Sequence, residues 1–282
     1  KSLATTPEDA PLDLPKRPKR WRRGFQPGVL LDRDGKVLGG GDGPEDADAE
    51  EYLDWCTAQG CVGLEKVRLR LGGGVTLRSG FGSVAKGEPF FMVPASAWLT
   101  AEPAEGESPE EALTWRFLSE VWLGEASCFA PFVKHLRRAD MSTHPVMWDE
   151  EEVNWLRVSA EGLEALRYAR KVAEERVARL VERAKRETAP TSLLSDEVAL
   201  AQEIRWAMCL CEAKGLVVGD DEEQGKEFGA LCPLVGDIRN TSRRDIHMAF
   251  EEAEEGLVLK ALEETHPGAE LLQRLDPTAS SA

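Results

Sequence analysis

Hydrophobic and polar residues alternate in the first third of the chain in a way that predicts short strands. Val67, Leu69 and Leu71 alternate with basic residues, which is the period of a half-buried strand. Three consecutive glycines at positions 72–74 supply a turn, and the alternation resumes after them, so we expect a β-hairpin. The run at positions 90–94 is apolar throughout and predicts a short, fully buried strand.

The middle of the chain carries patterns that are typical of helices. Ser108, followed by Pro109 and two glutamates, is a favourable helix start, and the apolar spacing behind it runs to Gly124. Residues 160–185 place apolar side chains on one helical face. We interpret this segment as a helix that packs within its own domain, with a partner-binding helix as the alternative. Another helix is predicted over residues 195–214.

The order of these elements bounds the fold class. A short helix is expected at residues 51–59, before the strands, and residues 231–275 have the pattern of short strands and turns. Strands, then a helical insert, then irregular strands predict an α+β fold. The 282 residues suffice for one large domain or two small ones.

Composition limits the classes of function. Hydrophobic residues make up 42% of the chain, which is ordinary for a globular core, and the formal net charge is −16. Acidity on this scale argues against nucleic acid as the main partner. No apolar run approaches the roughly 18 residues that a membrane span needs, so we expect a soluble chain without a transmembrane segment.

The first 45 residues predict an extended or disordered tail, because their composition buries too little apolar surface to order itself. A compact basic block at residues 16–23 is followed by a glycine-rich and then acidic stretch at 35–48. Docking on phosphate, anionic lipid or an acidic protein surface is one interpretation, favoured by the tryptophan among the arginines. The other is a solvated tail that folds over the acidic body of the same chain. The candidate docking residues are Lys19, Arg20, Trp21, Arg22 and Arg23.

Cysteine and histidine usage gives no sign of a metal site. The six cysteines are Cys56, Cys61, Cys128, Cys209, Cys211 and Cys232. The Cys-x4-Cys and Cys-x-Cys spacings among them lack the second pair that a zinc site needs. The four histidines do not cluster in sequence. We therefore expect reduced, structural thiols and no bound metal.

A glycine-containing motif is the first sign of a particular chemistry. Gly80, Phe81 and Gly82 are followed by an apolar-Ala pair, a Gly-Glu turn and a strand that ends in Val-Pro at position 94. Glycines suit a close approach of the backbone to a ligand. The whole segment is similar to the opening of a SET domain, and this resemblance implies that the glycines face the methionine part of S-adenosylmethionine.

Four later segments resemble one branch of that family, the Rubisco large-subunit lysine methyltransferases. Residues 124–136 are similar to the helical insert of the branch, and residues 144–153 resemble its Pro-x-x-Trp-x-x-x-Glu segment. Trp206 and Ala207 stand where the branch has Trp-Ala. Residues 231–242 are similar to its Leu-x-Pro-x-x-Asp-x-x-Asn-His-Ser motif.

The resemblance implies a SET-domain fold of short β-sheets with a helical insert. The expected parts are an N-terminal tail at residues 1–45, the first part of the SET core at 46–100, the helical insert at 101–214, the second part of the core at 215–276 and a short tail at 277–282. The substrate-binding helical domain that this family carries after its SET core has no counterpart in these residues.

The chain departs from the family at the positions that carry the chemistry. Thr241 replaces the family histidine, and the region where the family has an arginine ends in Lys214. The tyrosine that lines the family's lysine channel falls near Leu275, so we assign no catalytic residue. If the chain is active, the resemblance implies S-adenosylmethionine binding at Gly80, Phe81, Gly82, Asn240 and Thr241.

Two functions follow from these observations. We interpret the chain as a degenerate SET-domain protein, expected to hold no cofactor, that is a structural or docking subunit of a larger assembly, with the basic tail as anchor. The alternative is an active S-adenosylmethionine-dependent protein-lysine N-methyltransferase. The family's name-giving member works in plastids, so we expect a chloroplast location, with the cytoplasm as alternative. The start at Lys1 indicates either a removed leader or a fragment.

Overall fold

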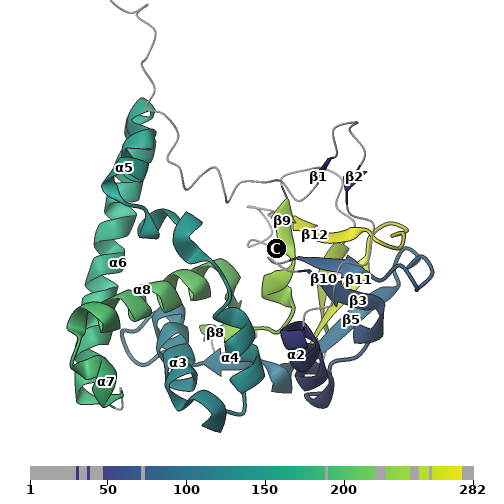
Figure 1. Cartoon of the computed structure of the whole chain (residues 1–282), viewed down its shortest axis with the longest axis horizontal. Helices are drawn as coiled ribbons and strands as arrows, with labels where there is room; N and C mark the ends of the chain where they lie inside the picture. The colour runs from purple at the N-terminus through teal and green to yellow at the C-terminus, as the bar shows by residue number, and fades with distance from the viewer. Residues whose placement is uncertain are drawn as a thin grey trace, which may run out of the picture.

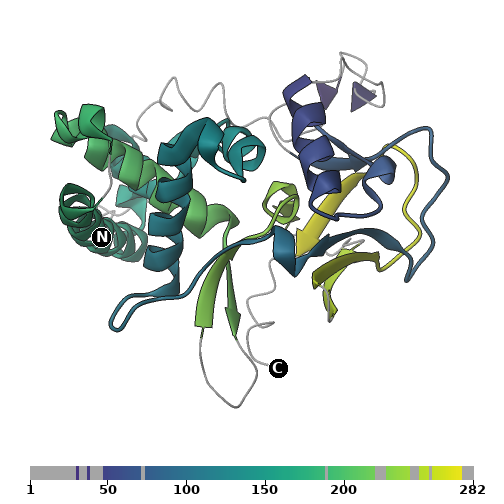
Figure 2. The same ribbon diagram turned by 90° about the horizontal axis from the view of Figure 1, so that it is seen from below.

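The computed structural model describes residues 30–31, 37–38, 47–70, 74–187, 190–219, 227–241, 248–253 and 256–274. Helices α3 and α5 to α8 gather at one end of the molecule, and strands β3, β5 and β9 to β12 lie at the other (Figure 1). Figure 2, a view from below, shows the same separation, with α2 on the side of the strands. The expected α+β class and the helical region between two groups of strands are confirmed.

The helices have the following bounds. They are α2 (Ala47–Ala58), α3 (Pro109–Leu123), α4 (Ala130–Leu136), α5 (Glu150–Val153), α6 (Ala160–Arg186), α7 (Thr191–Leu194) and α8 (Glu197–Lys214). Ser108 caps α3 as predicted, because its Oγ accepts a hydrogen bond of 3.3 Å from the backbone N–H of Glu111. None of the helices in the described part of the chain has the length and apolar character needed to cross a bilayer.

The strands are short. They are β1 (Leu30–Leu31), β2 (Val37–Leu38), β3 (Val67–Leu69), β4 (Val75–Leu77), β5 (Pro89–Pro94), β6 (Leu99–Ala101), β7 (Leu216–Gly219), β8 (Glu227–Leu231), β9 (Arg239–Thr241), β10 (Met248–Ala253), β11 (Gly256–Ala261) and β12 (Glu270–Arg274). They form sheets of order β3-β4-β12-β9, β10-β11-β5, β6-β8-β7 and β1-β2. All pairs are antiparallel except β9 with β12, which is parallel.

The predicted hairpin is present as β3 and β4. Val67 and Leu69 are buried, and so are Val75 and Leu77, as the period-two pattern requires. Leu71 and the three glycines assigned to the turn fall at residues 71–74, of which only Gly74 lies within the described residues. The expected tail lies outside them too, apart from the short β1-β2 hairpin.

Helix α6 buries the face that its sequence predicts. The buried residues of that face include Leu166, Ala173, Val177, Leu180 and Ala184. They face into the chain's own core together with α8, and two ion pairs join the C-terminal part of α6 to residues 107–111, at and just before the start of α3. These pairs are Arg179 with Glu111 at 2.7 Å and Arg183 with Glu107 at 2.8 Å. The helix therefore packs within its own chain along this face.

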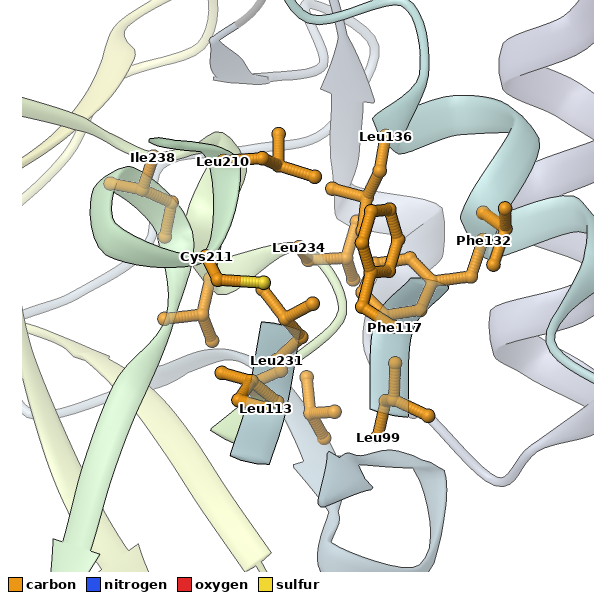
Figure 3. Packing of buried hydrophobic residues seen from close by; sticks show 14 of the residues in the cluster. Leu99, Leu113, Phe117, Phe132, Leu136, Leu210, Cys211, Leu231, Leu234 and Ile238 are labelled. Atoms are coloured by element: carbon orange, nitrogen blue, oxygen red, sulfur yellow. The ribbon is translucent and has the colours of Figure 1, made fainter. Parts of the chain in front are cut away.

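One continuous core joins the helical insert to the strands. Figure 3 shows side chains from β6, α3, α4, α8 and β8 meeting in it, among them Leu99, Phe117 and Leu231. The sheet β6-β8-β7, which the sequence patterns did not reveal, supplies the contact with α3. Gly229 is needed at that contact, because a Cβ atom there would lie 2.5 Å from the carbonyl oxygen of Pro109.

Candidate functional site

The loop that contains Gly80 and Gly82 follows β4 and is exposed. A Cβ atom built on either glycine meets no atom of the described chain within 4 Å, so the backbone faces open space. Phe81, between them, is 40% exposed. Neither glycine has a positive φ angle, so the turn itself does not demand glycine. The open space is what a closely approaching ligand would require.

The second candidate segment, Asn240 and Thr241, lies on β9. The backbone of β9 pairs in parallel with β12, with Asn240 opposite Gln273 and Thr241 opposite Arg274. The orientation of these side chains lies outside the described structure. The strand nevertheless places the Asn-Thr pair at the edge of the sheet that also contains β4.

Strand β12 connects the two candidate segments but holds them at different ends. The backbone N–H of Leu77, just before the glycine loop, donates to Ala269 O at 2.9 Å, at the start of β12. Asn240 lies opposite Gln273, four residues further along. At about 3.3 Å per residue, the two attachment points are about 13 Å apart along the strand. The structure thus brings both motifs to one sheet without direct contact between their attachment points.

A buried charged cluster lies immediately before β9, and the sequence patterns did not reveal it. The carboxylate of Asp237, only 6% exposed, accepts a hydrogen bond from His135 Nε2 at 3.0 Å and pairs with Lys214 Nζ at 3.1 Å. His135 and Asp237 are 102 residues apart in sequence, so no local spacing could have joined them. We call His135, Lys214 and Asp237 the buried charge cluster.

The environment of Asp237 keeps its carboxyl ionised. Burial raises its pKa, but the hydrogen bond from His135 and the positive charge of Lys214 outweigh burial and hold the pKa below the ordinary carboxyl value. Lys214 Nζ also donates to the carbonyl oxygen of Gly236 at 2.7 Å. The ammonium group of Lys214 therefore has two hydrogen-bond partners inside the protein.

The chain's two tyrosines both lie on helices, one of them buried and the other exposed. Tyr52 is fully buried on α2, and its hydroxyl accepts a hydrogen bond of 2.9 Å from the backbone N–H of Leu234. Its ring stacks on His135 with centroids 4.1 Å apart. Tyr168 lies on α6 and is 71% exposed. The family tyrosine position, Leu275, lies outside the described residues.

The remaining predicted site residues fall outside the described structure or show no cluster. Lys19, Arg20, Trp21, Arg22 and Arg23, the candidate docking residues, lie outside the described residues. All six cysteines of the chain are free, and Cys128 alone among them is exposed. Within the described ranges, no group of three or more His, Cys, Asp or Glu residues could hold a metal ion.

Comparison with known proteins identifies the fold. No protein-family model matches the chain, and no curated protein sequence does. The SET domain of LSMT bound to methyllysine and AdoHcy matches with a TM-score of 0.62 and 17% identity, over 83% of this chain and 54% of that chain. Rubisco LSMT bound to sinefungin and monomethyllysine matches with a TM-score of 0.57 and 15% identity, over 82% of this chain and 53% of that one. Rubisco LSMT bound to AdoMet matches with a TM-score of 0.56 and 14% identity, over 84% and 54%.

These matches confirm the SET-domain methyltransferase-like fold that the sequence motifs predict. At such low identity they bear on the fold alone. The chain spans about half the length of the solved structures that it matches, with 54% of the first covered.

Proposed function

We propose that this chain is a degenerate SET-domain protein that does not transfer methyl groups and is a structural or docking subunit of a larger assembly, in the chloroplast. The proposal rests on the positions and contacts of the chain's two tyrosines. If the chain used the lysine channel of the family it resembles, a tyrosine hydroxyl would have to reach the substrate amine. The hydroxyl of Tyr52 is instead hydrogen-bonded to the backbone N–H of Leu234 in the core, and Tyr168 is exposed on the helical insert.

The buried charge cluster supports the same proposal. The ammonium group of Lys214 is held by Asp237 and by the Gly236 carbonyl, and its side chain is 17% exposed. A cation used in this way stabilises the junction between the insert and the core and is withdrawn from ligand binding. A point charge also cannot reproduce the planar, two-pronged contact of an arginine.

An active protein-lysine N-methyltransferase is the second candidate, and one observation favours it. The space beside Gly80 and Gly82 is open, and Asn240 lies on the same sheet. In a pseudoenzyme nothing would prevent side chains from filling that space. If S-adenosylmethionine binds, the loop backbone and the β9 edge would be its contacts.

Calorimetry of the full chain with S-adenosylmethionine separates the two candidates. We expect no heat of binding, and no labelled methyl group transferred to proteins of a chloroplast extract. Asn240→Ala should then match the parent, as should Gln273→Ala, its paired neighbour on β12. Micromolar binding that Asn240→Ala abolishes and Gln273→Ala retains would overturn the inactive assignment.

The docking role has a separate test in the tail. In native size fractionation of a chloroplast extract, the tagged full chain should migrate with a large complex. The double substitution Trp21→Ala and Arg22→Ala should shift it toward the size of the free chain. Lys36→Ala, a basic residue beyond the block, is the control that should not. Migration of the parent as a free chain would refute the docking role.

A further inference from the structure

The end of helix α2 brings two cysteines together. The backbone N–H of Cys61 donates to Cys56 O at 3.0 Å, and that of Gly60 donates to Thr57 O at 3.0 Å. Gly60 has a φ angle of +92°. These two bonds and the left-handed glycine define a Schellman motif, in which the side chains at the positions of Cys56 and Cys61 contact each other. The Cys-x4-Cys spacing thus produces a thiol pair.

The geometry of this pair is compatible with a covalent bond. The 3.0 Å hydrogen bond joins the two residues, so their Cα atoms are at most about 6.9 Å apart by standard bond lengths. Disulfides span Cα separations of roughly 4.4 to 6.8 Å. Both cysteines are buried, so the two side chains share the same closed part of the core.

The thiols differ in reactivity. The hydrogen bond between them lowers the pKa of Cys61 and, together with burial, raises the pKa of Cys56. Cys61, at 3% exposure, is also slightly less buried than Cys56, at 0%. A thiolate is the nucleophile in thiol–disulfide exchange, so the lowered pKa favours Cys61 over Cys56 as the attacking residue.

We infer that Cys56 and Cys61 form a reversible disulfide by exchange with a small-molecule or protein disulfide. The Cys61 thiolate attacks one sulfur of the oxidant and releases the first thiol. Cys56 then loses its proton and attacks Cys61 Sγ, which releases the second thiol. Two electrons and two protons pass from the cysteine pair to the oxidant disulfide, which leaves as two thiols. Reduction by a dithiol runs the same steps backward.

The thiol pair is connected to the segment that leads to β9. Tyr52 lies one turn before Cys56 on α2, at the i,i+4 spacing that places helical side chains side by side, and its hydroxyl accepts the N–H of Leu234 at 2.9 Å. Among the described non-glycine residues, Leu234 alone has a positive φ angle, 69°. This conformation is unfavourable for a residue with a side chain, so it depends on such a partner. Oxidation of Cys56 therefore weakens the support of the turn that precedes Asp237.

The other four cysteines of the chain provide the controls for a test of the Cys56–Cys61 pair. Cys209 and Cys211 are also close in sequence, but they are two residues apart on α8, a spacing at which helical side chains do not face each other. Cys232 lies near Cys61 and raises the alternative of a bond between those two residues. Replacing the exposed Cys128 by serine prevents intermolecular disulfides.

The test equilibrates the full chain carrying Cys128→Ser in oxidised and reduced glutathione, followed by acid trapping and non-reducing peptide mapping. We expect the mass to fall by two hydrogen atoms and the peptide map to show a Cys56–Cys61 disulfide. Dithiothreitol should reverse both changes. Cys209 and Cys211 should still react with an alkylating reagent after denaturation. A Cys61–Cys232 bond, or no disulfide at any redox ratio, would overturn the inference. The readout needs no cofactor, so it is independent of the proposed function.

Two further measurements separate the exchange steps. Cys56→Ser combined with Cys232→Ser should leave a stable glutathione adduct on Cys61, because no neighbouring thiol then resolves it. In the oxidised parent chain, hydrogen exchange at the Leu234 amide should be about fivefold faster than in the reduced chain, as expected for one weakened hydrogen bond. Unchanged exchange in a chain shown to be oxidised would refute the connection to the turn.

Discussion

Replacing Lys214 by methionine tests the buried charge cluster directly. Methionine retains most of the apolar stem of lysine but removes the ammonium group that lies 3.1 Å from Asp237 Oδ1. Asp237 is 6% exposed, so its carboxylate would remain buried with His135 as its remaining hydrogen-bond partner in the cluster. Removing one member of a buried ion pair costs about 3 to 5 kcal/mol. Since His135 remains and Lys214 is partly exposed, we expect a loss of about 3 kcal/mol.

Urea denaturation of the full chain measures this loss, with the slope of the transition checked for an unchanged unfolding reaction. Thermal unfolding should shift downward by roughly 9 °C for a protein of this size. Lys171→Met is the matched control, because Lys171 on α6 is 76% exposed and its ion pair with Glu175 spans 4.0 Å. That substitution should cost less than about 0.5 kcal/mol.

A double-substitution cycle refines the test. The loss of stability in Lys214→Met should arise from a buried carboxylate without its ammonium partner. If so, Asp237→Asn should lower the free energy of unfolding less in the Lys214→Met background than in the parent, because the uncompensated charge is then absent. Equal losses for Lys214→Met and Lys171→Met would refute the assigned role of the cluster. So would an Asp237→Asn effect that is the same in both backgrounds.

Three further predictions concern the core. Tyr52→Phe leaves the Leu234 N–H buried without its acceptor and should lower the free energy of unfolding by about 2 kcal/mol in urea titrations; no change would contradict the hydrogen bond. Gly229→Ala places a Cβ atom 2.5 Å from a backbone oxygen of α3 and should cost about 2 kcal/mol, whereas Gly82→Ala, with no atom within 4 Å, should leave stability unchanged. The pKa of Asp237 is lower in the folded than in the unfolded chain, so its contribution is complete above the unfolded-state value of about 3.9 and is lost as the pH falls through the folded-state value. The stability difference between the parent chain and Asp237→Asn should therefore shrink on acidification, and a difference that grows would refute this sign.

Local patterns predicted the elements that depend on neighbouring residues. The hairpin of β3 and β4, the capped start of α3 and the buried face of α6 all follow from spacing within a single segment. The sheet β6-β8-β7 was missed because its strands have 3, 5 and 4 residues, too short for a clear period, and are paired across the whole helical insert. Strand propensity is weak evidence when pairing partners are distant in sequence.

The candidate site was likewise predicted in part from the sequence and in part not. The glycine loop and the Asn-Thr pair were visible as motifs, and the structure places the loop directly after β4 and the pair on β9 of the same sheet. No sequence pattern revealed the buried charge cluster, although Asp237 lies inside the motif at residues 231–242. Its third member, His135, comes from α4, and nothing in the local sequence connects it to the other two.

The sequence by itself determined the fold class and the SET resemblance, because these depend on residue identity and short-range order. Only the tertiary structure decided what the remaining residues do. Tyr52, which the helix predicted at residues 51–59 does not single out, binds the backbone of a turn with a positive φ angle at Leu234, and Lys214 is part of an internal ion pair. The physical reason is that hydrogen bonds and buried charges act over a few ångströms in space, whatever the separation along the chain.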